Sequence, residues 1–185
     1  MTFPKILKAQ KIVGKNLALR NVGLEDSQFI LDLRVDPNKS KYLNQTSSQI
    51  EDQNEWIRGY QSSDNQAYFI IENEGKKIGT LRIYDPREYS FCWGSWILKA
   101  GSPWDSAIES ALMAYTYAID VLKFKEAHFD VRKENIAVWK FHESFGATRI
   151  RESEADFFYT LDHKSIEASR KQYKNFLPSF EVYPI

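Results

Sequence analysis

The sequence predicts one α+β domain in which a mixed, mostly antiparallel sheet of about six or seven strands is flanked by helices. Three observations carry this prediction. Two β-rich runs, 68–72 and 77–84, flank Asn73-Glu74-Gly75-Lys76, which suits a hairpin turn. Residues 104–122 then carry an apolar stripe at helical spacing. The run 127–132 returns to the alternation of a half-buried strand.

The elements before the hairpin are one strand and two helices. A first strand is expected at 17–22, and a helix over 24–34 follows with apolar residues at helical spacing. Asp36-Pro37-Asn38 ends that helix, because the residue before a proline disfavours helical geometry. Ser47-Ser48 is expected to cap a second helix that runs to about residue 60.

The elements after the hairpin complete the order β-α-α-β-β-β-α-β-α-β-β, which a final helix follows. They are a strand at 91–98, the helix at 104–122, the strand at 127–132, a helix at 135–145, strands at 147–151 and 157–161, and a charged helix at 163–176. The chain contains no repeat and no linker-like stretch, so residues 1–185 are expected to form a single domain.

Composition narrows the functional classes. The 25 basic and 25 acidic residues balance, which argues against a nucleic-acid partner. Aromatic residues make up 15% of the chain and suit a packed core with a ligand cleft. The single cysteine, Cys92, excludes an internal disulfide and favours a reducing compartment. No apolar run is long enough for a membrane span or a signal peptide, so we expect a cytoplasmic protein without a membrane partner.

The most specific pattern lies between 128 and 147. An alternating strand leads to Asn135, a short helix carries His142 seven residues later, and Gly146 stops that helix. This pattern resembles the C-terminal half of the GNAT acyltransferases, which transfer an acetyl group from acetyl-CoA to an amine. In that family Asn is followed seven residues later by Tyr and then by Gly-Phe. Here His142 and Ala147 stand in the Tyr and Phe positions.

The resemblance covers nearly the whole chain, because the predicted order of elements is also the GNAT order. Leu19-Arg20-Asn21-Val22, followed by Glu25-Asp26, resembles the branch that includes ribosomal-protein and sugar-nucleotide N-acetyltransferases. The resemblance therefore implies the GNAT acyl-CoA N-acyltransferase fold, acetyl-CoA as acyl donor and a small-molecule amine as acceptor. It is also compatible with a homodimer.

Catalytic candidates follow from the same resemblance. It implies that His142 protonates the departing CoA thiolate, and histidine has an ordinary pKa suited to proton transfer. Asp130 is the first candidate for the base that deprotonates the amine, Glu109 is the second, and a chain of waters is a third route. Each candidate also has an interpretation without catalysis. His142 could be an ordinary helix histidine, Asp130 could pair with Arg132 on the same strand face, and Glu109 could simply interact favourably with the dipole at the start of its helix.

The cofactor is expected at two places. In GNAT proteins the phosphate loop reads Gln/Arg-x-x-Gly-x-Gly/Ala, and here Asp105 and Ala107 occupy the glycine positions. The expected phosphate-binding residues are Trp104, Asp105, Ser106, Ala107 and Ile108, where a helix N-terminus offers free N–H groups. The alternative is a loop that only caps a core helix.

The second place is the strand before that loop. The resemblance implies that the strands at 91–98 and 127–132 splay apart, so that the pantetheine arm pairs with the backbone of Trp96, Ile97 and Leu98. A backbone N–H near Ile97 is expected to stabilise the oxyanion. Asn135 is expected both to cap its helix and to contact the cofactor.

The sequence therefore predicts an N-acetyltransferase that acts on a primary amine. Phe141-His142-Glu143 resembles sugar-nucleotide acetyltransferases, and three aromatic side chains could stack on a base or sugar: Tyr42, Trp56 and Tyr84. Two alternatives stay open: a non-catalytic GNAT-fold binding module with a decayed cofactor loop, and an acetyltransferase of protein N-termini. The remaining candidates for a metal site or a nucleophilic triad lack the spacing for either: His128, His163 and Cys92.

Overall fold

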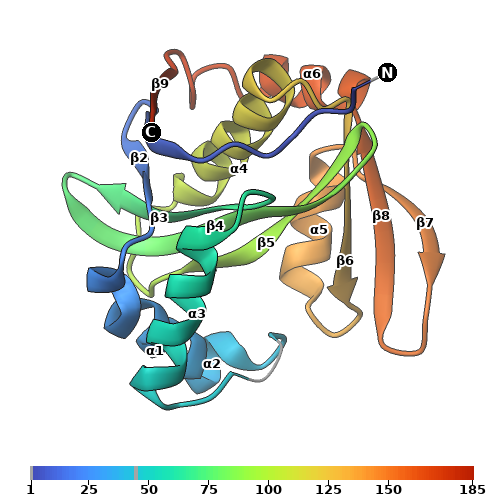
Figure 1. Cartoon of the computed structure of the whole chain (residues 1–185). Coiled ribbons are helices and arrows are strands. Elements are labelled where there is room, and N and C mark those ends of the chain that lie inside the picture. The colour runs from blue at the N-terminus through green and yellow to red at the C-terminus, as the bar shows by residue number, and fades with distance from the viewer. Residues whose placement is uncertain (1, 44–45) are drawn as a thin grey trace.

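A computed structural model describes residues 2–43 and 46–185 (Figure 1). Its strands are β1 Ala9–Val13, β2 Leu17–Asn21, β3 Ala67–Asn73, β4 Lys76–Arg87, β5 Ser90–Leu98, β6 Glu126–Arg132, β7 Thr148–Glu152, β8 Asp156–Asp162 and β9 Glu181–Pro184. Its helices are α1 Ser27–Val35, α2 Pro37–Ser40, α3 Ile50–Ser62, α4 Ser106–Thr116, α5 Ile136–Ser144 and α6 His163–Gln172. A 3-10 turn at Leu24–Asp26 precedes α1, and a π-helical turn at Tyr117–Val121 extends α4.

The described strands form one mixed sheet of nine strands in the order β7-β8-β6-β5-β4-β3-β2-β1-β9. All pairings are antiparallel except β5 with β6. Helices α1 to α3 cover one face, and α4 and α6 cover the other (Figure 1). Strand β3 shows why both faces need cover, since Phe69 and Ile71 join the core beneath α4, whereas Tyr68 and Ile70 join the smaller core beneath α1 and α3. The predicted α+β class is confirmed.

The hairpin prediction is also confirmed. Glu74 and Gly75 have φ angles of +49° and +74°. Two successive positive φ values match the twist of a two-residue hairpin turn, and glycine enters this region without steric strain.

Several boundaries differ from the prediction. Strands β1 and β9 were not expected, and they raise the strand count to nine. Helix α3 begins at Ile50 with Gln49 as its N-cap, and the Ser47 hydroxyl instead accepts a hydrogen bond from the Gln49 N–H at 3.1 Å. Ser47 therefore closes a turn ahead of the helix and does not cap the helix itself. The expected continuation of the last helix to residue 176 is wrong, because α6 ends at Gln172.

The feature that positions the site is the junction of β5 and β6. These parallel strands share only two registered pairs, Ser90 with Glu126 and Phe91 with Ala127. Strand β5 continues to Leu98 and β6 to Arg132, so the two strands diverge beyond the junction. The predicted split in the sheet is thus confirmed. No helix in the described part of the chain has the length and apolar character to cross a membrane.

Candidate active site

The diverging strands enclose a cleft of about 210 Å³. Strand β5 contributes Cys92, Trp93 and Ser95, and β6 contributes Phe129, Asp130 and Val131. Helix α5 closes one end with Asn135, Val138 and His142. The cleft brings together the sequence-predicted residues His142, Asp130, Asn135 and Trp96, which the chain supplies from three separate elements.

A bulge in β5 shapes this cleft. Thr80 pairs with Ile97 whereas Arg82 pairs with Gly94, so one residue of β4 faces two of β5. Ser95 takes up the extra length with a φ of +45°, and its carbonyl accepts a 2.7 Å hydrogen bond from the Thr80 hydroxyl. A non-glycine residue in this region is strained, and such bulges re-aim side chains next to active sites. The sequence gives no local signal for this bulge.

His142 is enclosed by aromatic rings. The Phe129, Trp93 and Trp96 rings lie 4.2, 5.3 and 6.2 Å from the imidazole, centre to centre. The indole N–H groups of Trp93 and Trp96 donate to the Tyr115 and Ser110 hydroxyls of α4, each at 3.1 Å, so the enclosure is fixed in place.

This enclosure determines the protonation state of His142. The residue is 6% exposed, and its Nδ1 has no hydrogen-bond partner among the described residues. Burial lowers the pKa of His142 to about 3. The imidazole is therefore neutral at physiological pH, and His142 does not have the ordinary histidine pKa that was expected from the sequence.

Asp130 lies on the opposite face of β6 from Phe129 and is exposed at the cleft. Within the described residues it makes no hydrogen bond or ion pair, so the alternative of a pair with Arg132 is not observed; Arg132 pairs with Asp156 at 3.1 Å. Burial raises the pKa of Tyr84, and the neighbouring Cys92 and Asp130 raise it further. Asp130 is thus a free carboxylate whose charge acts on the cleft.

Glu109, the second candidate base, has a structural role. It is 1% exposed, and its Oε1 accepts the Asn16 and Leu17 N–H groups at 2.7 and 3.0 Å. These bonds tie α4 to the β1–β2 hairpin. Glu109 does not line the cleft within the described residues.

The expected phosphate loop leads into α4. Trp104 is 79% exposed, and its ring lies edge-on to Phe176 at 5.7 Å. Asp105 is the N-cap of α4 but makes no side-chain capping bond with the described residues. The Ser106 N–H donates to the Pro103 carbonyl at 3.1 Å, so it is not the free donor that the sequence suggested.

Asn135 is the N-cap of α5, but not through its side chain. Its carbonyl accepts the Val138 and Trp139 N–H groups at 3.1 and 3.2 Å, whereas its amide makes no capping bond within the described chain. The amide borders the cleft, where it can contact a ligand.

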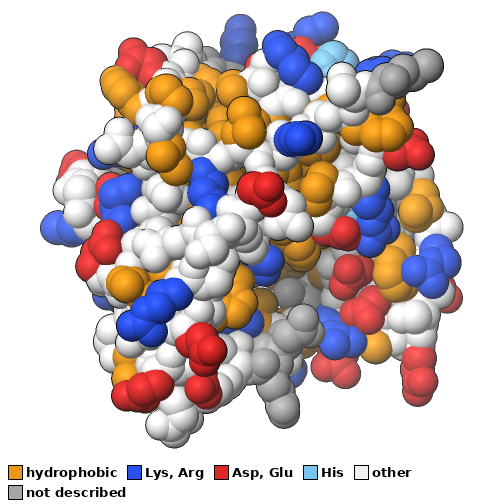
Figure 2. All heavy atoms as spheres, viewed as in Figure 1, with side chains coloured by type: hydrophobic (Ala, Val, Ile, Leu, Met, Phe, Trp, Pro, Cys, Tyr) orange, Lys and Arg blue, Asp and Glu red, His pale blue; other side chains and the backbone are white. Residues whose placement is uncertain are grey.

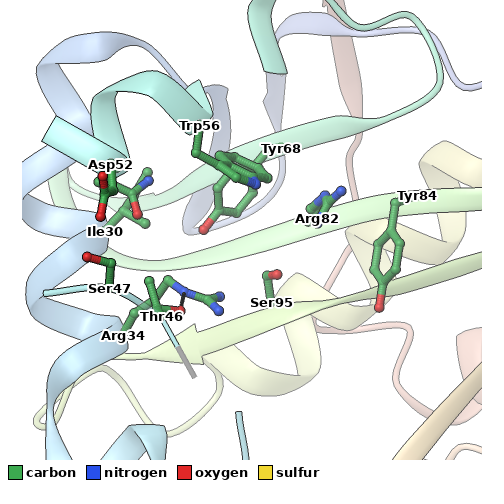
Figure 3. Close-up of a pocket in the computed structure, with 11 residues that line it drawn as sticks. Ile30, Arg34, Thr46, Ser47, Asp52, Trp56, Tyr68, Arg82, Tyr84 and Ser95 are labelled. Atoms are coloured by element: carbon green, nitrogen blue, oxygen red, sulfur yellow. Dashed lines mark hydrogen bonds between the residues drawn. The ribbon is translucent and has the colours of Figure 1, made fainter. Parts of the chain in front are cut away.

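A second, larger cavity of about 410 Å³ lies beside the cleft (Figure 3). The two share Arg34, Tyr84 and Ser95, so they form one continuous recess. The larger cavity also includes Trp56 and Arg82. The sequence pattern did not point to Arg34 and Arg82 as site residues. The available signal was the alternation of β4, which places Arg82 on the same face as Tyr84.

The face of the molecule seen in Figure 2 carries no dominant charge. Figure 2 shows acidic and basic side chains interspersed on the visible face, which is hollowed beside the layer of α1 to α3. Among the described residues, no group of three His, Cys, Asp or Glu side chains is arranged to hold a metal ion.

Comparison with known proteins agrees with this geometry. Residues 16–148 match the family described as an acetyltransferase (GNAT) domain. The apo structure of FdhC, described as a nucleotide-linked sugar GNAT, is 36% identical with a TM-score of 0.80, over 96% of this chain and 99% of that chain. A comparison with curated protein sequences found no match.

Two more distant structures share the fold. A GCN5-related N-acetyltransferase from Brucella melitensis is 14% identical with a TM-score of 0.78, over 96% of this chain and 90% of that one. The spermidine N-acetyltransferase from Vibrio cholerae, in complex with CoA and spermine, is 16% identical with a TM-score of 0.71, over 82% and 98%. The split sheet, the cleft and the family match agree, and the chain belongs to the GNAT family of N-acetyltransferases.

Proposed function

We propose that this N-acetyltransferase uses acetyl-CoA to acetylate a primary amine carried on a nucleotide-linked sugar. The observation that carries the proposal is the end of β5–β6 pairing after Phe91, which opens a cleft between two strand edges. The 36% identical neighbour described as a nucleotide-linked sugar GNAT supports the acceptor class.

The open edge of β5 suits the acyl donor. Beyond Phe91 no described strand pairs with β5 on its β6 side, so backbone groups of Trp96, Ile97 and Leu98 on that side are available to an extended arm. The N-terminus of α4 supplies a positive dipole end for the CoA diphosphate near Ala107 and Ile108. Asp105 is expected to point away from the phosphates, because like charges repel.

Two residues of the cleft, Asp130 and His142, each carry out one proton transfer. The exposed Asp130 carboxylate accepts the first proton, which converts the acceptor ammonium into a neutral amine. The amine nitrogen then bonds to the acyl carbon, and the carbon–sulfur bond breaks. Because His142 starts neutral, it takes the second proton from that nitrogen and passes it to the departing thiolate. His142 can therefore protonate the thiolate although it carries no charge in the resting protein.

A thiol-release assay with a panel of acceptors tests the proposal. The panel holds nucleotide-linked amino sugars, the same amino sugars without the nucleotide, spermidine, and a peptide with a free N-terminus. We expect acetyl-CoA-dependent thiol release with a nucleotide-linked amino sugar and at least a tenfold lower kcat/KM with the free sugar. Preference for the peptide would favour a protein N-terminal acetyltransferase instead.

A thermal titration with acetyl-CoA isolates the donor step. A ligand that binds only the folded protein at 100 times its Kd adds about 2.7 kcal/mol of stability, so the melting temperature should rise clearly. The Asp105→Gly variant should show the same rise if the carboxylate points away from the diphosphate. An unchanged melting temperature at millimolar acetyl-CoA would refute the donor and leave a non-catalytic binding module.

A further inference from the structure

The larger cavity contains an arginine, Arg82, whose charge no described residue neutralises. Arg82 extends from β4 between the buried residues Leu81 and Ile83, which face the other way. Its Nε donates to the Gln66 side-chain oxygen at 2.7 Å, and Arg82 forms no ion pair with any described residue. The two terminal amino groups of its guanidinium make no hydrogen bond within the described chain. They therefore present an open fork to the cavity.

A second cation faces the same space. Arg34, in the last turn of α1, lines both the cavity and the cleft and donates from its Nε to the Thr46 hydroxyl at 2.8 Å. Burial lowers the pKa of Arg82, and the nearby charge of Arg34 lowers it as well. Because the charge of Arg34 disfavours the charged form of Arg82, an anion bound between the two side chains would relieve the repulsion.

Aromatic side chains form the walls beside this fork. The Arg82 guanidinium lies 5.1 Å from the Trp56 ring and 4.6 Å from the Tyr84 ring. Trp56 is held against Tyr60 and Tyr68 at 6.1 and 5.5 Å between ring centres, yet it remains 40% exposed. A rigid, half-exposed indole is a stacking surface for a planar base.

One acidic residue also faces the cavity. Asp52 comes from the first turn of α3. Figure 3 shows it beside Ile30 and Ser47, well separated from Arg82. Its carboxylate repels phosphate at that end but can accept a hydrogen bond from a base N–H or a sugar hydroxyl. The charges thus divide the cavity into a cationic end and an acceptor end.

Resting on the proposed function, we infer that this cavity is the nucleotide subsite of the acceptor. Arg82 and Arg34 bind its phosphate oxygens, and Trp56 stacks on its base. Arginine binds phosphate through a planar two-point contact, which the open fork of Arg82 offers. Tyr84 and Ser95 border both cavities, so an acceptor anchored at Arg82 extends into the cleft toward Asp130. The volume of about 410 Å³ is in the range of small-ligand sites.

Calorimetric titration with thymidine 5′-diphosphate and uridine 5′-diphosphate tests the subsite. The protein is first saturated with CoA, because CoA itself carries a nucleotide and would compete for the cofactor site. We expect Arg82→Gln to weaken binding of the preferred nucleotide by about 10- to 100-fold, the range for a lost charge-assisted contact. The nucleotide affinity of Arg82→Lys should lie between those of the wild type and Arg82→Gln, because lysine keeps the charge but lacks the planar two-point contact.

Two controls separate the site from general charge and from folding. Arg58→Gln removes the same charge from an exposed position on α3 and should change affinity by less than about twofold. The melting temperature of Arg82→Gln should lie at most a few degrees below that of the wild type, because the change removes a partly buried cation whose charge is disfavoured. If it does unfold, Arg34→Gln provides the second measurement.

The outcomes separate this inference from the proposed function. Equal nucleotide affinity in wild type and Arg82→Gln overturns the subsite, as does loss of nucleotide binding once CoA is present. If CoA itself fails to bind, the titration is run without it. A loss in Arg82→Gln would then support the subsite while the acetyl-CoA proposal fails.

Discussion

Replacing His142 by phenylalanine should remove the loss of folding stability that this residue causes as the pH falls. Burial lowers the pKa of His142 from 6.5 to about 3, so the folded protein keeps it neutral where the unfolded chain protonates it. Its contribution to stability is therefore fully present above pH 6.5 and is lost as the pH falls toward 3. One pKa unit corresponds to 1.36 kcal/mol, so the 1.5 units between pH 6.5 and pH 5 remove about 2 kcal/mol.

Urea unfolding of wild type and His142→Phe at pH 7 and pH 5 measures this term, because all other titrating groups cancel in the difference. Relative to wild type, the variant should gain about 2 kcal/mol on acidification, or about 4–8 °C in melting temperature for a domain of this size. Ile136, which lies on the same helix and is 52% exposed, is the control; the uncharged change Ile136→Ala should follow the wild-type pH dependence. Parallel curves for His142→Phe and wild type would show that burial does not hold His142 neutral.

The same variant tests the proton relay. His142→Phe should lower kcat by roughly 10- to 1,000-fold and leave CoA binding nearly unchanged, the range expected for loss of proton transfer. His142→Tyr should restore much of the activity, since tyrosine has the reach and a transferable proton. Equal turnover in wild type and His142→Phe would mean that the thiolate leaves without this residue.

Three further predictions follow from close contacts and burial. Gly79→Ala should destabilise the protein by about 1–3 kcal/mol in urea unfolding, because an added Cβ would lie 2.3 Å from the Ile97 carbonyl. It should also weaken CoA binding if CoA pairs with β5 as proposed. Asp26→Ala should cost about 3 kcal/mol in the same assay, because Asp26 is fully buried and accepts two hydrogen bonds from Arg20, at 2.8 and 2.9 Å. Burial raises the pKa of Cys92 to about 11, so mass spectrometry should show slow iodoacetamide labelling at pH 7.5 in the folded protein and rapid labelling in urea.

The sequence predicted best where the pattern is long and local. The stripe of α4 and the hairpin at Gly75 each carry a period or a turn residue that fixes the local structure. Strand β9 lies at the far end of the chain from its partner β1, and the five residues of β1 carry too short a pattern to be recognised. Such pairings depend on contacts between distant segments, which local propensity does not encode.

The site was predictable in its residue types but not in its environment. The spacing from Asn135 to His142 pointed to a histidine on this helix, and the structure places both residues at the cleft. Its low pKa depends on rings from β5 and β6, which no spacing on α5 reveals. The cavity with Arg34 and Arg82 was not predicted for the same reason, because the two residues lie on different elements that only the fold brings together.

The divergence of β5 and β6 has a consequence for self-association. Unpaired strand edges usually invite pairing with another copy of the chain. Here the two free edges face each other inside the sheet and meet at Ser90 and Phe91, with α5 closing one end. A neighbour's strand would have to fit between β5 and β6 instead of lying along an outer edge of the sheet, whereas a slender, extended molecule can slide between them. These two unpaired strand edges thus lie in the middle of the sheet, away from its outer strands β7 and β9, where a small extended ligand has access to them.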